Sequence, residues 1–215
     1  MPRRKLNWNN FMRVGIFGGS FDPIHQGHLI LAEQCRQLAK LDQVLFIPSA
    51  QAPHKEDGAT ATDRQRVEMV DLAIGGHPAF LRSSIEIERG GVSYTVDTLK
   101  QLAEESPENE LFFLMGADSL NSFGSWKEPK EILRLATPLV VPRPGQGEVD
   151  LEKLAPLTDE KQMETIRQLT IDSPLIEISS TNIRQQVESG NSIRYQTSRA
   201  VEKYIETQKI YQNKK

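Results

Sequence analysis

Apolar residues along the chain follow two alternating spacings. Continuous apolar runs of strand length occur at 13–19, 43–48, 110–115 and 138–141. Other segments repeat their apolar residues every three to four positions, as an amphipathic helix does, at 27–40, 63–74, 93–105, 126–135, 181–189 and 197–208. Strands that alternate with helices predict βαβ units and a parallel sheet covered on both faces.

The remaining segments are less regular. Residues 80–87 and 173–178 have an extended pattern. Residues 49–61 have the small and polar composition of a loop, and residues 151–169 fit no single element. Ser93 or Thr95 is expected to cap the helix that starts near them.

Together these elements predict an α/β fold: a Rossmann-like, doubly wound parallel sheet with helices on both faces and a C-terminal helical segment. We expect one domain over residues 12–215, preceded by a flexible extension, 1–11, or an alternative start at Met12. Ligands of such sheets bind beyond the carboxyl ends of the strands, at the point where the strand order reverses. Motifs that begin where a strand stops are therefore the first candidates for function.

Composition narrows the class of protein. With 215 residues and 38% hydrophobic content, the chain can bury a full core, and its net charge of −3 indicates neither nucleic acid nor an anionic membrane as partner. Its one cysteine, Cys35, excludes a disulfide within the chain and lies on an apolar helical stripe, which favours a core position over a nucleophile. No apolar run approaches the roughly 18 residues of a membrane span. The basic N-terminus has no apolar stretch after it, so it is not a secretory signal, and we expect a cytoplasmic protein.

The segment GGSFDPIHQGH follows the first strand and enters the first helix. Gly18 and Gly19 lack a Cβ, so a phosphate can approach their backbone closely. Gly27 lies where the helix begins, at the positive end of its dipole. His25 and His28 are three residues apart and can meet at that junction. The pattern predicts a phosphate-binding corner.

This segment has two other interpretations. Glycine-rich turns between a strand and a helix are common without any ligand, and the segment is neither a Walker loop nor a GxGxxG motif. Paired histidines also suggest a metal, but only His54 and His77 remain elsewhere and there is no cysteine cluster. We therefore expect no protein metal site.

The segment ISSTNIR, residues 178–184, opens another helix near the end of the chain. Ser179, Ser180 and Thr181 supply hydroxyl groups and a helix cap, and Arg184 lies about one turn further on. Alone, this pattern is a helix cap. Paired with the first motif, it predicts that two helix N-termini, two histidines and an arginine converge on one polyanion.

The two motifs together resemble the HxGH nucleotidyltransferase superfamily. Further segments resemble one branch of it, the bacterial-type nicotinate-nucleotide adenylyltransferases: APHK (52–55), ERGGVSYTVDTL (88–99), GADSLNSFGSW (116–126), VPRPG (141–145) and YIETQKIY (204–211). The resemblance covers the chain after residue 12. Ala52 departs from it, because the family often has a second proline there, and we expect this to change loop stiffness and not chemistry.

The resemblance implies transfer of the adenylyl group of ATP to nicotinate mononucleotide. The acceptor phosphate attacks the α-phosphorus in line, so no enzyme nucleophile is needed. The implied catalytic residues are His25, His28 and Arg184. The implied contacts to ATP and its phosphates are Gly18, Gly19, Ser20, Phe21, Lys55, Gly116, Asp118, Ser179, Ser180 and Thr181. Mg²⁺ is expected on the ATP phosphates, with oxygen ligands from substrate and water.

The resemblance also implies contacts to the pyridine nucleotide. Trp126 would stack on the nicotinate ring, and Thr95, with backbone N–H groups near Lys127, would hold its carboxylate. The alternatives stay open: a core tryptophan, a helix cap at Thr95, an acidic helix start at Asp118 and a solvated lysine at Lys55.

Three rival functions remain at this level. A relative of the same superfamily could use nicotinamide mononucleotide or phosphopantetheine as acceptor, or a cytidylyl donor. A nucleotide-sensing module would not need both histidines and Arg184, since binding alone requires no transition-state contacts. A fragment of an RNA-charging enzyme would share HQGH but would carry a second, lysine-rich signature that this chain lacks.

Overall fold

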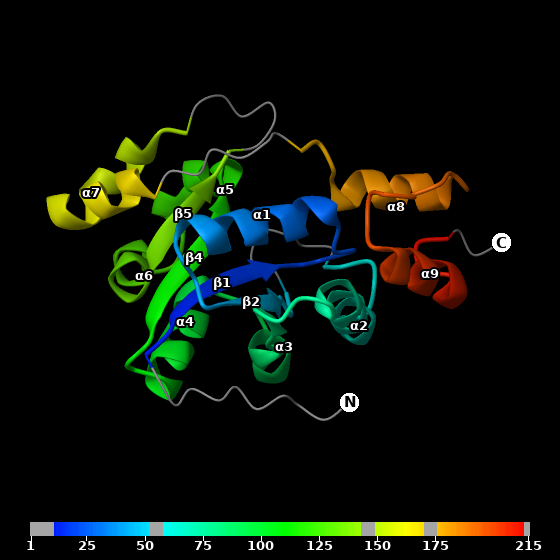
Figure 1. The fold of residues 1–215 in the computed structure, drawn as a ribbon, viewed down its shortest axis with the longest axis horizontal. Coiled ribbons are helices and arrows are strands. Elements are labelled where there is room, and N and C mark those ends of the chain that lie inside the picture. The colour runs from blue at the N-terminus through cyan, green and yellow to red at the C-terminus, as the bar shows by residue number, and fades with distance from the viewer. Residues whose placement is uncertain (1–10, 52–57, 143–148, 170–175, 213–215) are drawn as a thin grey trace.

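The computed structural model describes residues 11–51, 58–142, 149–169 and 176–212. Its centre is one five-stranded sheet in the order β3-β2-β1-β4-β5, and every adjacent pair is parallel (Figure 1). The strands are β1 (Arg13–Gly19), β2 (Gln43–Pro48), β3 (Phe80–Arg82), β4 (Glu110–Gly116) and β5 (Thr137–Val141). The predicted Rossmann-like sheet is confirmed.

Helices connect the strands and follow the last one. They are α1 (Gln26–Leu38), α2 (Asp63–Ile74), α3 (Ile85–Arg89), α4 (Thr95–Glu105), α5 (Ala117–Ser122), α6 (Pro129–Leu135), α7 (Glu160–Gln168), α8 (Ser180–Glu188) and α9 (Arg199–Gln208). Two 3₁₀ segments, η1 (Phe123–Ser125) and η2 (Leu151–Leu157), lie between them.

Each strand sends alternate side chains to two separate cores. In β2, Val44 and Phe46 join one cluster, whereas Leu45 and Ile47 join the other. The first cluster is completed by α1, α2, α8 and α9, and the second by α3 to α7. Figure 1 shows α1 and α4 on opposite sides of the strands. The sheet is therefore doubly wound, because helices bury both of its faces.

The strand order reverses between β1 and β4. From β1 the chain adds β2 and β3 on one side, then returns to add β4 and β5 on the other. Pairing of β1 with β4 stops at Ile16↔Phe113, whereas β1 stays paired with β2 to Gly19↔Pro48 and β4 with β5 to Gly116↔Val141. The last residues of β1 and β4 thus part from each other, and this is where sheets of this type bind ligands.

Three local predictions need correction. Only the first part of 80–87 is a strand, because Ile85 opens α3 and buries itself in the second cluster. The cap of α4 is Tyr94, with no side-chain capping bond, and the Ser93 hydroxyl accepts a hydrogen bond from the Ala50 N–H instead (3.0 Å). The described end of 173–178 belongs to no strand. Tertiary contacts override local preference in each case.

Other predictions hold. Cys35 is fully buried, and burial raises the pKa of its thiol to about 12, as expected of a core cysteine and not of a nucleophile. Residues 151–169, which fitted no single element, form η2 and α7. Within the described ranges, no helix combines the length and the hydrophobicity needed to cross a membrane.

Leu99 on α4 tests the second core. Its side chain is 0% exposed, so Leu99→Ala should lower the free energy of unfolding by about 2–5 kcal/mol through lost burial and a cavity. Urea unfolding followed by circular dichroism measures this. Leu72→Ala, the same change on α2 at a side chain that is 42% exposed, is the control and should cost about 1 kcal/mol or less. Equal losses in the two variants would contradict the assignment of Leu99 to the core.

Candidate active site

The loop after β1 is held in an unusual conformation. Phe21 has φ 46°, a left-handed conformation that costs a bulky residue about 1–3 kcal/mol. Its ring is buried against Phe17 (centroids 5.5 Å) and Phe46 (5.8 Å). Of the predicted phosphate contacts, Phe21 can therefore offer a ligand only its backbone. A Cβ on Gly18 would meet nothing within 4 Å, so space is left beside the backbone at that glycine.

His25 and His28 meet at the start of α1, as predicted. Their rings stack with centroids 3.6 Å apart and an interplanar angle of 25°. The backbone N–H of His25, the N-cap, donates to His28 Nδ1 at 3.2 Å. A neutral His28 ring that accepts at Nδ1 carries its proton on Nε2, so Nε2 is its hydrogen-bond donor. The Phe21 ring lies edge-on to His28, 5.1 Å away, and fixes the plane of the imidazole.

Gly27 has a steric role that the sequence did not reveal. A Cβ at this position would lie 3.1 Å from both Cε1 and Nδ1 of His25. A larger residue would therefore require the His25 ring to shift by a few tenths of an ångström. The first turn of α1 contains no acidic residue, so the positive end of the helix dipole is not neutralised there.

The second motif docks on the first although they are more than 150 residues apart. Ser180 Oγ donates to the Pro23 carbonyl (2.8 Å), and Arg184 Nη1 donates to the Asp22 carbonyl (2.8 Å). Ser179 caps α8 by accepting from the Asn182 N–H (3.1 Å). Thr181 Oγ1 accepts from Arg184 Nη2 at 3.4 Å. The two motifs therefore meet as predicted, through Ser180 and Arg184, and their joint binding of one polyanion stays a prediction.

Sequence reasoning missed two charged residues behind this loop. The Arg66 side chain is fully buried and donates to the carbonyls of Ser20 (2.7 Å) and Ser49 (2.6 Å) and to Asp63 (2.6 Å). Asp22 is 3% exposed and accepts from backbone N–H groups of the β2–α2 connection. The loop is thus tied to the end of β2 and to α2. A charged residue within a regular helical pattern, such as Arg66, gives no sign of this in the sequence.

The end of β4 lies on the other side of the switch point from the end of β1. Gly116 is the last residue of β4 and the N-cap of α5. Asp118 is exposed in the first turn of that helix. Both residues predicted to face ATP here therefore lie at the switch point, next to the loop after β1. The position of Asp118 also fits the acidic helix start that was its alternative interpretation.

The three predicted pyridine contacts lie close to one another. Trp126 follows η1, is half-buried, and packs edge-on to Phe113 of β4 (centroids 5.8 Å). Lys127 Nζ lies 3.0 Å from the Asp97 carboxylate and 4.7 Å from the Tyr94 ring centre. Thr95 is the first residue of α4, between these two partners in sequence. Contacts across α4 and the end of η1 thus bring Thr95 and Lys127 to one place beside Trp126.

One prediction concerns a metal site, and another concerns Lys55. Within the described ranges, no group of three or more His, Cys, Asp and Glu side chains is placed to hold a metal ion. The loop of residues 20–25, which leads into α1, is called the histidine loop. Its acidic group, the Asp22 carboxylate, accepts from N–H and O–H donors instead. Lys55 falls outside the described residues.

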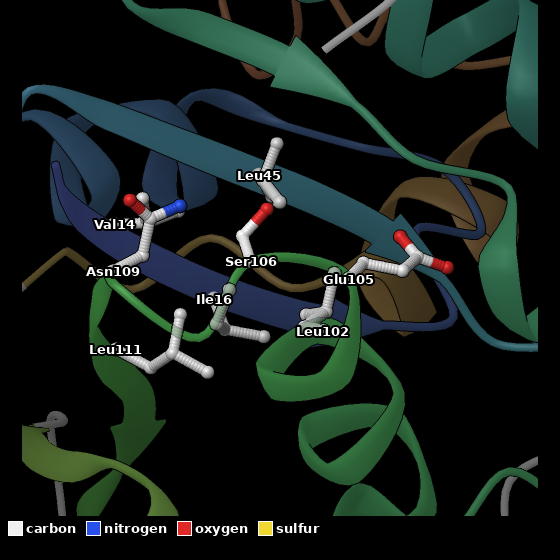
Figure 2. A pocket seen from close by; sticks show the side chains of 8 residues that line it. All are labelled: Val14, Ile16, Leu45, Leu102, Glu105, Ser106, Asn109 and Leu111. Atoms are coloured by element: carbon white, nitrogen blue, oxygen red, sulfur yellow. The ribbon is translucent and has the colours of Figure 1, made fainter. Parts of the chain in front are cut away.

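Figure 2 shows a small pocket at the opposite end of the sheet. Its lining includes Val14 and Leu111, near the amino ends of β1 and β4, together with Ser106 and Asn109. It has no space for a water-sized sphere. The pocket lies at the wrong end of the strands for a ligand at the switch point, and it cannot hold a nucleotide.

Comparison with known proteins agrees with this geometry. Residues 16–186 match the family described as cytidylyltransferase-like. A protein of Thermus thermophilus named "Probable nicotinate-nucleotide adenylyltransferase" is 44% identical over 200 residues, covering 93% of this chain and 100% of its own. A protein of Citrifermentans bemidjiense with the same name is 40% identical over 212 residues, covering 93% and 98%.

Solved structures share the fold. The nicotinic acid mononucleotide adenylyltransferase of Plasmodium falciparum, complexed with NaAD, superposes with a TM-score of 0.71 at 20% identity and covers 93% of this chain and 97% of its own. The same protein complexed with APC gives a TM-score of 0.70 at 19% identity over the same shares. The family match spans both motifs of the site, and the chain belongs to the cytidylyltransferase-like family of nucleotidyltransferases, in its nicotinate-nucleotide adenylyltransferase branch.

Proposed function

We propose that this protein transfers the adenylyl group of ATP to nicotinate mononucleotide, giving nicotinate adenine dinucleotide and pyrophosphate, in NAD biosynthesis. The observation that carries the proposal is the docking of α8 on the histidine loop, through Ser180 to Pro23 and Arg184 to Asp22. This contact brings two helix N-termini to one place, and neither has an acidic residue in its first turn. Relatives at 40–44% identity carry the name of this activity.

The site performs the reaction by alignment and charge stabilisation. The acceptor phosphate attacks the α-phosphorus of ATP in line, and pyrophosphate leaves from the opposite side. His25 and His28 would contact the reacting phosphates, and His28 Nε2 would donate to the charge that grows in the transition state. The buried partners of the loop hold these donors in place before substrate arrives, so little reorganisation is needed during the step.

The triphosphate would lie between the two motifs. Gly18, Gly19 and Ser20, with the backbone of Phe21, would face it from the end of β1. Ser179, Ser180, Thr181 and Arg184 would hold the β- and γ-phosphates from α8. Gly116 and Asp118 would contact the ATP ribose at the end of β4, and Lys55 would reach the phosphates from the β2–α2 connection.

Mg²⁺ would enter with ATP and remain on its phosphates. It would withdraw charge from the phosphate oxygens while the protein's own donors fix their positions. We propose ATP and nicotinate mononucleotide as the partners, with neither nucleic acid nor membrane, and the cytoplasm as the location. Residues 12–215 would act as one domain after the extension 1–11.

The nicotinate ring would stack on Trp126. This side chain is half-buried, so one part of it packs on Phe113 and Phe123 while another remains available. The nicotinate carboxylate would accept from Thr95 and from backbone N–H groups near Lys127. The Lys127 ammonium already pairs with Asp97, so its side chain shapes this pocket and does not serve as the main anion contact.

The first test is pyrophosphate release by the purified protein with Mg-ATP and each of three acceptors: nicotinate mononucleotide, nicotinamide mononucleotide and phosphopantetheine. A fourth mixture without an acceptor gives the background. Release with nicotinate mononucleotide supports the proposed reaction. Release with phosphopantetheine alone would move the protein to another branch of the superfamily. Binding of ATP without release in any mixture would indicate a nucleotide-sensing module and overturn the proposal.

His28→Ala should lower kcat by about 10²–10³-fold, because one preorganised donor to the transition state is lost. Steady-state pyrophosphate release measures the change, and the melting temperature should stay within a few degrees of wild type. His77→Ala is the matched control. The His77 ring stacks on Phe80, with centroids 3.9 Å apart, and does not belong to the loop after β1, so the kcat of this variant should be unchanged. Near-normal turnover of the His28 variant would refute the catalytic assignment.

Arg184→Ala should raise KM for ATP and lower kcat, with a combined loss in kcat/KM of roughly 10–100-fold, because a guanidinium contact to phosphate is lost. Initial rates over a range of ATP concentrations separate the two effects. Arg134→Ala removes an arginine that pairs with Glu131 on the exposed side of α6, and it controls for the change in net charge. A wild-type KM and kcat for Arg184→Ala would exclude this residue from the triphosphate site.

The acid should be preferred over the amide. Charge-assisted hydrogen bonds to a carboxylate contribute about 1.5–3 kcal/mol, which corresponds to a preference of roughly ten- to hundredfold for nicotinate over nicotinamide mononucleotide. The ratio of the two kcat/KM values measures it. Equal kcat/KM values would leave the proposed adenylyl transfer standing but would contradict the assignment of Thr95 and Trp126 to the nicotinate pocket.

A further inference from the structure

One buried carboxylate connects three distant segments of the chain. Asp22 lies inside the histidine loop and is 3% exposed. Its Oδ2 accepts from the Thr60 N–H (2.7 Å), and its Oδ1 accepts from the Ala61 N–H (3.1 Å) and from the Tyr211 hydroxyl (2.6 Å). The loop after β1, the segment before α2 and the segment after α9 thus meet at one side chain.

The backbone of the same residue carries the contact to α8. The Asp22 carbonyl accepts from Arg184, and the next carbonyl, of Pro23, accepts from Ser180. The residue before Asp22, Phe21, has the left-handed φ of 46°. Such a conformation persists only where its surroundings over-determine it. The contacts of Asp22 are therefore part of what fixes the path of the chain into His25.

Tyr211 reaches Asp22 from beyond α9. Its ring packs against the first core cluster, and its own φ is 64°. Burial, together with the negative charge of Asp22, raises the pKa of Tyr211. Its hydroxyl therefore stays protonated and donates to the carboxylate. A hydrogen bond to a buried charged acceptor is among the stronger ones in proteins.

We propose that Tyr211 is a positioning residue for the reaction: through its hydrogen bond to Asp22 it holds the loop that carries His25 and His28 against α8 and the substrate phosphates. This inference rests on the proposed adenylyl transfer. Tyr211 touches no reacting atom, and it acts through Asp22. The C-terminal segment is in this way part of the scaffold of the active site, although it lies after the last residue matched by the family, 186.

The chain supplies a matched control on the same segment. The Tyr204 hydroxyl, on α9, donates to the carboxylate of Glu68 on α2. Its ring also packs against the first core cluster. Tyr204→Phe and Tyr211→Phe each remove one hydroxyl and one hydrogen bond to a carboxylate. They differ in whether that carboxylate belongs to the histidine loop.

The experiment compares the full-length wild type with the two variants, well below their melting temperatures. Tyr211→Phe should lower kcat about tenfold or more, because small displacements of aligned groups reduce rates strongly. Its KM for nicotinate mononucleotide should stay within twofold, since the pyridine contacts lie on other segments. Tyr204→Phe should keep both parameters. Hydrogen–deuterium exchange should increase in peptides covering 18–25 and 58–62 for Tyr211→Phe alone.

The exchange measurement is independent of turnover and separates two kinds of failure. If the wild type is inactive with nicotinate mononucleotide but exchange in 18–25 still increases in Tyr211→Phe alone, the proposed function is overturned and the Tyr211–Asp22 contact is supported. Unchanged exchange in 18–25 together with wild-type kcat in Tyr211→Phe would overturn the positioning role. Equal losses of kcat in both variants, following equal losses of melting temperature, would show that Tyr211 contributes only to stability and would also overturn it.

Discussion

The parting of β1 and β4 is the constraint on which the site depends. Their pairing ends at Ile16↔Phe113, and each strand then stays paired only with its outer neighbour. The cause is topological, because the connections from β1 and β4 lead to helices on opposite faces of the sheet. The ends of β1 and β4 thereby lie apart at the switch point, while the remainder of the sheet keeps its pairing.

A chain of net charge −3 must concentrate positive potential locally to attract a polyphosphate. The structure does this with groups that need no excess of basic residues. The N-termini of α1 and α8 both lack acidic residues in their first turn, and their contacts bring them together with Arg184 at the loop after β1. Helix dipoles and oriented N–H groups act over short distances, so this arrangement works only because the two motifs touch.

Two buried charged residues hold the loop after β1 against its neighbours. Arg66 binds carbonyls at the ends of β1 and β2, and Asp22 binds N–H groups before α2. Burying a charge is costly unless its hydrogen bonds are satisfied. Asp22 meets this condition with partners from several segments, whereas Arg66 binds three partners through Nη1 and Nη2 while its buried Nε has none among the described residues. A change in one segment therefore affects the others. Preorganisation of this kind favours reactions that depend on alignment rather than on a protein nucleophile.

The sequence by itself determined the features that depend on neighbours along the chain. Alternating spacings identified the strands β1, β2 and β4 and the helix α2 nearly to the residue, and the apolar stripe placed Cys35 in the core. The GGSFDPIHQGH and ISSTNIR motifs marked the loops that meet. Helical and strand periods are local properties, set by which face of an element is buried.

The tertiary structure decided the rest. The folding of Ile85 into α3, the use of Ser93 to bind Ala50 and not to cap α4, and the roles of Arg66, Asp22 and Tyr211 have no local signature. Each depends on a partner distant in sequence, such as the 189 positions between Asp22 and Tyr211. A side chain's period along its own helix or strand shows which face is buried, but the group that a polar atom meets there is fixed only when the whole sheet and its covering helices are assembled.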